Sequence, residues 1–406
     1  MQISNANFKY KFKLTNPISS HKINEKAKII SYQKITEKEI FMHLTIGFLG
    51  LGLIGGSIAK SIRKYHPDYT LIGYNHNYET ALLAQREQIL DLAVKEVDSS
   101  FSNCDIIYLC MPVSFNEEYL SQVKPYLKKG CILTDVGSVK GNIHQAVKKL
   151  SLEEYFIGGH PMAGSEKTGF SNSTDHLLEN AYYILTPCKC TSKDAIDRLY
   201  HLTASIKAIP IVLDPKEHDY AVANISHLPH LIAAGLVNLI QKSDSDTETM
   251  KTLAAGGFKD ITRIASSSPV MWQQICLTNK ENIVQTIEHY LSYLSEIRDA
   301  VKQEDGDYLY QFFEQARIYR NSIPAKSSGP ITTIYAMYCD LIDEAGSLAK
   351  IVVVLAEHGI SIKNIGITHT RDFQEETLRI EFYEQNAMLL AQKLLEQLHY
   401  SVTICS

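Results

Sequence analysis

The sequence lacks the features that mark several classes of protein. Its 40 Lys and Arg against 45 Asp and Glu leave a net charge of −5, so there is no basic field for nucleic acid or an anionic membrane. No continuous apolar run reaches the roughly 18 to 20 residues of a membrane-spanning helix. The eight cysteines form no C-x-x-C pair, which argues against a zinc knuckle or a disulfide framework and predicts reduced thiols in a cytoplasmic protein. What remains, at 406 residues, is a globular chain of two or three domains with small-molecule chemistry.

The first 41 residues differ from the rest of the chain. They contain eight Lys and three Glu but no Asp or Arg, with little helical or strand periodicity. They lack the apolar segment of a secretory signal, and the lack of Arg argues against a transit peptide. We expect residues 1–41 to be a disordered or dispensable extension, with an arm that packs on the body as the alternative.

Residues 42–214 are predicted to form an α/β domain of Rossmann type. Short β-branched and aromatic runs alternate there with helical patterns, which is typical of βαβ units and a mostly parallel sheet. The candidate strands are 44–49, 70–74, 105–110, 131–135, 156–158, 182–186 and 209–213.

Beyond residue 214 the strand signals stop, and an all-helical domain is predicted over 215–325. Its apolar helix faces exceed what one sheet can cover, so we expect it to join two chains in a homodimer as well as to bind substrate. The candidate helices are 217–241, 247–265, 271–303 and 306–320.

A linker rich in Pro, Ser and Gly over 321–330 precedes the last domain, 330–406. The patterns there predict the order strand, helix, strand, strand, helix, strand, which is the ferredoxin-like βαββαβ arrangement. The segments are 331–339, 346–358, 362–370, 377–382, 387–397 and 401–405.

A glycine-rich turn follows the first predicted strand and opens a helix, which is the context that the G-x-G-x-x-G motif requires. Gly50 is expected to make the tight turn, Gly52 to let the backbone approach a pyrophosphate, and Gly55 to bring helix and strand together. The unpaired N–H groups of the helix N-terminus would bind the phosphates. The sequence therefore predicts a dinucleotide site.

The adenine ribose would meet Asn75, where Rossmann domains usually carry Asp or Glu. An amide can bind a ribose hydroxyl, but it does not repel a 2′-phosphate as a carboxylate does, and a protonated His76 could accept one. Because no Arg lies in residues 74–78, we favour NAD without excluding NADP.

Two later strands end in polar residues. Asp135 ends one of them and Ser138 follows it, while His160 lies at the end of the next, between Gly and Pro. The carboxyl ends of parallel strands gather at the cofactor crevice, so Ser138 and His160 can meet there, and Asp135 is predicted to contact the cofactor.

His218, His227 and His230 could suggest a metal site. Hydride transfer to a nicotinamide needs no metal, and no Cys or paired carboxylate completes a ligand set. We therefore predict none.

The segments that contain Ser138 and His160, together with S-H-L-P-H at 226–230 and G-G-F-K-D-I-T-R-I-A at 256–265, resemble the prephenate dehydrogenase family. The resemblance runs from about residue 46 to 320. The resemblance implies oxidative decarboxylation of prephenate to 4-hydroxyphenylpyruvate and CO₂, in tyrosine biosynthesis, with the hydride passing to NAD. His160 suits the base for the ring hydroxyl, and Ser138 would bond His160 or that hydroxyl and fix the tautomer. Arg263 suits a substrate carboxylate, because guanidinium and carboxylate pair bidentately.

The same resemblance implies further pocket residues. His230 would line the substrate pocket, with His218 as a neighbour that orients His230 or the nicotinamide. Glu166 would pair with a cation at the pocket entrance, although a plain helix N-terminal charge also explains it. Trp272 matches a pocket position, and core packing explains it equally well.

Residues 343–348 and 355–365 resemble the amino-acid-binding turn and helix of an ACT domain. This implies an effector held by the backbone around Gly346 and by the Asn364 amide, with tyrosine favoured and phenylalanine second. Ala345 stands where that family usually has Pro.

Other functions remain to be weighed. Arogenate differs from prephenate only by an amino group in place of a keto group, and the residues do not separate the two substrates. A non-catalytic sensor of nucleotide and amino acid would be expected to lack the base, yet Ser138, His160 and Arg263 are all present. A generic 2-hydroxyacid dehydrogenase is disfavoured, because helices rather than a second Rossmann half follow the sheet.

Overall fold

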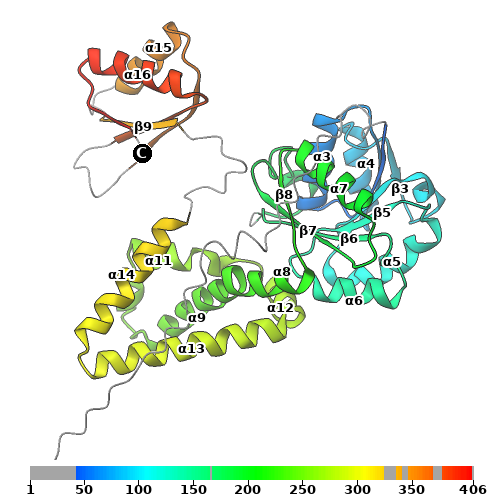
Figure 1. The fold of residues 1–406 in the computed structure, drawn as a ribbon, viewed down its shortest axis with the longest axis horizontal. Helices are drawn as coiled ribbons and strands as arrows, with labels where there is room; N and C mark the ends of the chain where they lie inside the picture. Colours follow the sequence, from blue (N-terminus) through cyan, green and yellow to red (C-terminus); the bar gives the residue numbers. More distant parts are fainter. Residues whose placement is uncertain (1–42, 165–166, 324–334, 341–345, 369–376, 405–406) are drawn as a thin grey trace, which may run out of the picture.

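The computed structural model describes residues 43–164, 167–323, 335–340, 346–368 and 377–404. The predicted extension, most of the predicted linker and Glu166 lie outside these residues. Figure 1 shows the described chain as a sheet domain, a group of long helices and a small C-terminal domain.

The first domain is built on an eight-stranded sheet in the order β3-β2-β1-β4-β5-β6-β7-β8. Neighbouring strands are parallel except for β6 and β7, which are antiparallel. The predicted Rossmann-like, mostly parallel sheet is therefore confirmed, with one strand, β3, that the sequence patterns did not predict. The strands are β1 Thr45–Leu49, β2 Thr70–Tyr74, β3 Leu92–Val94, β4 Ile106–Leu109, β5 Ile132–Asp135, β6 Phe156–Pro161, β7 Tyr182–Pro187 and β8 Ile209–Val212.

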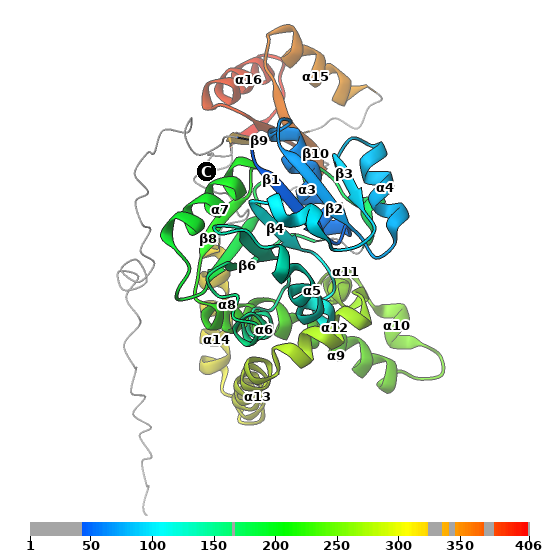
Figure 2. The same ribbon diagram turned by 90° about the vertical axis from the view of Figure 1, so that its right-hand side faces the viewer.

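Helices cover both faces of this sheet (Figure 2). All four residues of β4 are buried, because alternate side chains pack into two cores. Ile106 and Tyr108 belong to the core under α3, α4 and α7, and Ile107 and Leu109 to the core under α5 and α6. The helices are α3 Leu53–Tyr65, α4 Tyr78–Arg86, α5 Asn116–Val123, α6 Gly141–Lys149 and α7 Lys193–Ser205, with short 3₁₀ turns at Ser99–Asn103, Val113–Phe115, Lys124–Tyr126 and Phe170–Asn172.

The second domain is helical, as predicted, but its helices are more interrupted than the sequence patterns suggested. The run predicted at 217–241 contains a π-helical turn, Ala223–His227, because Pro229 has no N–H for the carbonyl four residues earlier. The run predicted at 271–303 breaks at Asn279. The helices are α8 Pro215–Val222, α9 Leu228–Ser243, α10 Thr249–Leu253, α11 Gly256–Thr262, α12 Pro269–Thr278, α13 Lys280–Lys302 and α14 Gly306–Ser322, with a 3₁₀ turn, η6, at Arg263–Ser266.

One helical run within the described residues, Pro215–Ser243, is long and apolar enough by length and composition to cross a bilayer, and 17% of its most apolar window is buried. The run also carries buried polar side chains, His218, Asp219 and His227, that bond to other parts of the protein. Such groups are costly inside a membrane. Its exposed apolar surface is therefore better explained by a protein partner than by lipid.

The C-terminal domain is a four-stranded antiparallel sheet in the order β10-β11-β9-β12. Helices α15 and α16 pack against it in one core, in which Ile351, Leu355 and Leu395 meet Met337 and Leu378. The elements are β9 Tyr335–Asp340, α15 Ser347–Glu357, β10 Ile362–Thr368, β11 Thr377–Phe382, α16 Gln385–Gln397 and β12 Val402–Ile404.

Candidate active site

His160 lies near the carboxyl end of β6, one residue before Pro161. The preceding Gly159 packs so closely on the backbone of Asp135 and on Tyr183 that a Cβ there would collide with both. Glycine is therefore needed for β5 and β6 to approach one another. This approach places His160 beside the loop that follows β5, which is the loop that contains Ser138.

The imidazole of His160 contacts a second histidine from the helical domain. His160 Nδ1 lies 2.8 Å from His218 Nε2, and His218 Nδ1 lies 2.8 Å from Asp219 Oδ1. Both His218 and Asp219 are on α8 and buried. His218 was predicted to orient His230 or the nicotinamide, and in the structure it contacts His160 directly.

Burial keeps the imidazole of His160 uncharged. Desolvation lowers the pKa of His160 well below 6.5, and the nearby His218, Lys140 and His227 lower it further. A neutral imidazole at neutral pH is the form that can accept a proton, so His160 has the protonation state of a general base.

We predicted that Asp135 contacts the cofactor, whereas in the structure its carboxylate bonds groups of the protein itself. Its side chain is almost fully buried, and its oxygens accept hydrogen bonds from the backbone of Gly137 and Gly159 and from Lys140 Nζ, the last at 2.6 Å. Lys140 Nζ also donates to the carbonyl of Gly159 at 2.6 Å. The geometry thus assigns Asp135, with Lys140, to holding the β5–α6 loop against β6.

Ser138 lies within this clamped loop and is half-buried. We predicted that it bonds either His160 or the ring hydroxyl and fixes the tautomer. In the structure the contact at His160 Nδ1 comes from His218. Ser138 therefore keeps the role of a candidate partner for the substrate hydroxyl.

A second cluster lies where α9 and α12 meet. The ring of His230 stacks on Trp272 with centroids 3.8 Å apart, and His230 Nδ1 lies 2.9 Å from the carbonyl oxygen of Ser226. His227 is buried and lies 3.2 Å from the amide nitrogen of Asn279. The structure thus pairs two predicted pocket residues, His230 and Trp272, and shows His227 as a bonded histidine of the helix packing.

Arg263 begins η6, directly after α11, and is exposed. The turn packs against α9, which is the helix that carries His230. The structure therefore brings the proposed carboxylate ligand to the same helix as the histidine–tryptophan pair.

The glycine turn has the geometry of a nucleotide-binding loop. Gly50 has φ +102°, which favours glycine, and its N–H donates to the carbonyl of Tyr74 at 2.8 Å. A Cβ on Gly52 would meet no atom within 4 Å, whereas one on Gly55 would collide with the carbonyl oxygen of Gly50. Space is thus open at Gly52, where a pyrophosphate would approach, and closed at Gly55, where helix α3 packs on the turn.

Asn75 follows β2 directly and reaches this turn. Its Oδ1 accepts a hydrogen bond from the backbone N–H of Leu51 at 2.9 Å, and its Nδ2 donates to the carbonyl of Asn77. The amide therefore supports the glycine turn, and its NH₂ group keeps one further hydrogen for a ribose hydroxyl.

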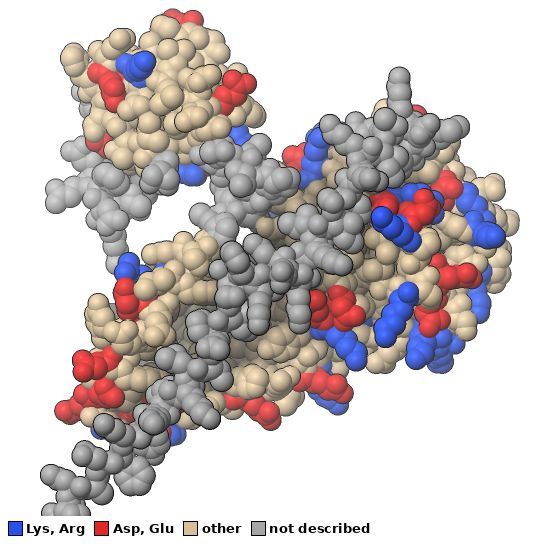
Figure 3. All heavy atoms as spheres, in the orientation of Figure 1, with Lys and Arg blue, Asp and Glu red and all other residues tan. Residues whose placement is uncertain are grey.

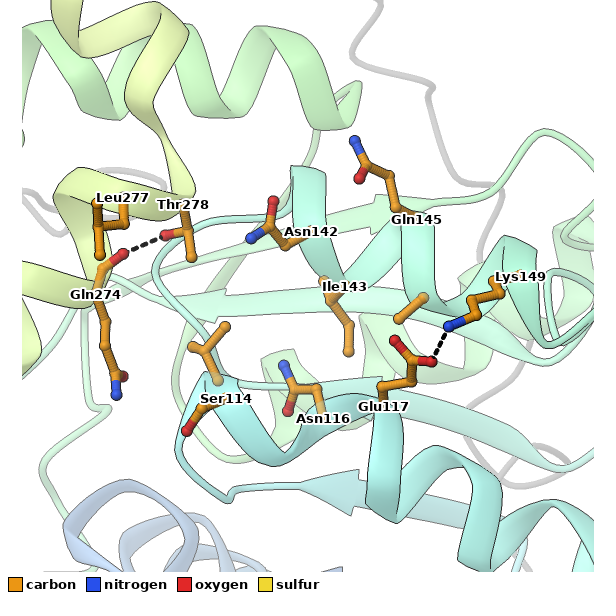
Figure 4. A pocket seen from close by; sticks show the side chains of 12 residues that line it. Ser114, Asn116, Glu117, Asn142, Ile143, Gln145, Lys149, Gln274, Leu277 and Thr278 are labelled. Atoms are coloured by element: carbon orange, nitrogen blue, oxygen red, sulfur yellow. Dashed lines mark hydrogen bonds and ion pairs between the residues drawn. The ribbon is translucent and has the colours of Figure 1, made fainter.

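A separate cleft of about 480 Å³ lies between the sheet domain and α12 (Figure 4). It contains none of the predicted site residues. Its lining comes from the segment after β4, from α5 and α6, and from α12, and Figure 4 shows the Glu117–Lys149 ion pair at one side of it.

The predicted regulatory residues lie in the C-terminal domain. Gly346 has φ +93° and immediately precedes α15, and Asn364 lies exposed on β10. Residues 343–345 of the predicted effector turn lie outside the described chain.

A Rossmann-like sheet with a glycine turn, joined to a helical domain through the contact between His160 and His218, is typical of a dinucleotide-dependent dehydrogenase. Comparison with family models places the chain within this class. The model of the prephenate dehydrogenase nucleotide-binding domain matches residues 58–212, and that of the prephenate dehydrogenase dimerization domain matches 214–315. The chain belongs to the prephenate dehydrogenase family.

Individual relatives agree. Prephenate dehydrogenase of Bacillus subtilis is 38% identical over 87% of this chain and 95% of its own length, and that of Lactococcus lactis is 34% identical over 86% and 96%. The crystal structure of prephenate dehydrogenase from A. aeolicus, in complex with hydroxyphenyl propionate and NAD⁺, is 32% identical with a TM-score of 0.66, over 70% of this chain and 99% of that one. Synechocystis arogenate dehydrogenase is 30% identical with a TM-score of 0.64, over 68% and 99%.

Proposed function

We propose that the chain catalyses the oxidative decarboxylation of prephenate to 4-hydroxyphenylpyruvate and CO₂, with NAD as the hydride acceptor. The observation that carries this proposal is the position of His160 near the carboxyl end of β6, in contact with His218, where burial lowers its pKa. The prephenate dehydrogenases of Bacillus subtilis and Lactococcus lactis, similar over nearly their whole length, support the choice of substrate.

The proposed chemistry uses the lone pair of the other nitrogen of His160. His160 Nε2 accepts the proton of the ring hydroxyl while the ring carbon that bears this hydroxyl loses its hydrogen as hydride. The bond to the ring carboxylate breaks, CO₂ leaves, and the electrons of that bond complete the aromatic ring. His160 then returns its proton to the ring oxygen, which gives the phenol of 4-hydroxyphenylpyruvate. Arg263 would pair with a carboxylate of this dianion, and Ser138 would hydrogen-bond the hydroxyl. The residues hold and orient the substrate, because aromatisation itself supplies the driving force.

NAD would occupy the turn Gly50–Gly55, with its pyrophosphate at Gly52 and at the N-terminus of α3. When bound, NAD supplies the ring carbon that receives the hydride. The open space at Gly52 and the remaining hydrogen of the Asn75 amide fit this cofactor. The A. aeolicus relative was crystallised with NAD⁺, which supports NAD over NADP.

Arogenate is the second candidate substrate, because one similar solved structure is an arogenate dehydrogenase. The test is an absorbance assay at the band of the reduced nicotinamide, with prephenate and arogenate each paired with NAD and NADP. We expect turnover with prephenate and NAD. Turnover with arogenate but not with prephenate would show that arogenate is the substrate. No turnover in any pairing would overturn the proposal.

The helical domain would join two chains. Its family model is named for dimerization, and large apolar side chains stay exposed along it, for example Leu239, Leu291 and Phe313. Exposed apolar surface of this extent is typical of a permanent interface. A homodimer through these helices is the assembly we propose.

The C-terminal domain would be a regulatory ACT domain with tyrosine as its effector. The sheet order β10-β11-β9-β12, with α15 and α16 in one core, agrees with the ferredoxin-like fold of such domains. Gly346 and the exposed Asn364 are available as backbone and amide contacts for an amino acid.

A further inference from the structure

We propose that Asp219 is a positioning residue that fixes the tautomer of His160 through His218. This inference rests on the proposed function, because it explains how one nitrogen of His160 becomes the base. It arises from the hydrogen bonds that the carboxylate of Asp219 accepts.

The carboxylate of Asp219 accepts three hydrogen bonds. Its Oδ2 accepts from the backbone N–H of Gly141 at 2.7 Å, and its Oδ1 accepts from the N–H of Lys140 at 2.8 Å and from His218 Nδ1. An ionised carboxylate can only accept. His218 must therefore donate from Nδ1.

This single constraint determines which ring nitrogens of His218 and His160 carry a proton. In a neutral His218 with its proton on Nδ1, Nε2 is an acceptor. His160 lies 2.8 Å from that nitrogen and must then donate from its own Nδ1. The proton of neutral His160 is held on Nδ1, and Nε2 keeps the lone pair that the proposed chemistry needs.

Asp219 also joins the two domains. Lys140 directly precedes α6 of the sheet domain and Gly141 begins it, whereas Asp219 belongs to α8 of the helical domain. The main-chain oxygen of Asp219 accepts from the side chain of Asn279, at the break before α13. The carboxylate that sets the tautomer is thus held only when both domains are docked.

The decisive variant is Asp219→Leu, which is similar in size but offers His218 Nδ1 no acceptor. His218 can then carry its proton on Nε2 and donate to His160 Nδ1, which would move the His160 proton to Nε2. Asp219→Asn is the matched control, because its amide oxygen can take the place of Oδ1, which accepts from both Lys140 and His218, and only the bond from Gly141 is lost. We expect kcat of Asp219→Leu to fall about 10²- to 10⁴-fold, the usual contribution of a general base, with KM and NAD binding changed less than about threefold.

The tautomer itself can be measured without turnover. In protein labelled with ¹⁵N-histidine, protonated and unprotonated ring nitrogens resonate far apart, and the His160 signals are assigned by their loss in His160→Asn. We expect a proton on Nδ1 of His160 in the wild type and in Asp219→Asn, and on Nε2 in Asp219→Leu, at a pH above neutrality. The same tautomer in the wild type and in Asp219→Leu would overturn the proposal, whether or not the chain turns over prephenate.

Two controls separate this role from general support of the fold. His218→Gln can still accept from His160 and donate to Asp219, whereas His218→Leu can do neither, so we expect the Gln variant to retain at least about tenfold more kcat. Asn279→Ala removes a contact to the main chain of Asp219 but leaves its carboxylate unchanged. If Asn279→Ala lowers kcat as much as Asp219→Leu does at similar thermal stability, Asp219 only supports the domain junction and the proposal is wrong.

Discussion

At the scale of single residues, His160 carries the sharpest prediction. His160→Asn keeps a polar side chain but removes the basic nitrogen, so kcat should fall about 10²- to 10⁴-fold while KM changes little. In the wild type the base is active when neutral and its pKa lies well below 6.5. The pH profile of kcat should therefore stay flat as the pH falls through 6.5 and decline only at more acidic pH. Steady-state kinetics from pH 5 to 8 would check this, and near-normal turnover of the variant would show that another group is the base.

Lys140 is the second residue with a measurable role. Its ammonium is fully buried and bonds the Asp135 carboxylate and the Gly159 carbonyl. Lys140→Met would leave a buried carboxylate without its cation, which costs about 3 to 5 kcal/mol of unfolding free energy. Denaturant unfolding would measure the loss. Lys129→Met is the matched control, because Lys129 is exposed and a surface change should cost less than about 0.5 kcal/mol.

The residues of the candidate site could be predicted from the sequence only in part. Ser138 follows β5 and His160 lies near the end of β6, and the rule that parallel strands end at one crevice predicted that both lie on the same side of the sheet. His218 and Asp219 lie in another domain, 58 residues or more from His160, and no local pattern specifies that distance. The burial of Asp135 was missed because a carboxylate after a strand can face either the crevice or a buried lysine, and only Lys140 decides between them.

At the scale of helices and strands, the long periodic segments were predicted well and their interruptions were not. β3 has three residues, too few to show an alternating pattern. The π-helical turn before α9 follows from Pro229, whose effect on the helix depends on how the chain packs. Asn279 ends α12 because its amide bonds Asp219 and His227, which are tertiary contacts that helical periodicity does not reveal.

The contact between the π-helical turn and α13 predicts a pH dependence of stability. Burial lowers the pKa of His227 from 6.5 to about 4, so the folded state holds this histidine neutral where the unfolded chain protonates it. Stability is therefore complete above pH 6.5 and falls as the pH drops towards 4, by up to about 3 kcal/mol from this group. His227→Gln should flatten that part of the curve of unfolding free energy against pH. His76→Gln, at an exposed histidine, should not, and an unchanged slope in His227→Gln would contradict the assignment.

At the scale of the whole molecule, the surface of the helices predicts the assembly. On the face shown in Figure 3, Lys and Arg are interspersed with Asp and Glu over the sheet domain. Leu239, Val301 and Phe313 are more than half exposed in a single chain. Light scattering at micromolar concentration should give the mass of a dimer. Glu substitutions at Leu239 and Phe313 should yield monomers, whereas a monomeric wild type would contradict the proposed interface.

The C-terminal domain predicts that regulation can be removed while catalysis is retained. The A. aeolicus relative is matched over 99% of its length by 70% of this chain, so a dehydrogenase of this family folds without a counterpart of the whole chain. A chain ended at Ile323, directly after α14, should keep kcat and lose inhibition by tyrosine. An effector can change catalysis only if it prefers one of two domain arrangements, and truncation removes the proposed binding domain. Because tyrosine resembles the product and can compete at the active site, intact and truncated enzymes are compared at saturating prephenate. Equal inhibition of both would show that the C-terminal domain does not carry the control.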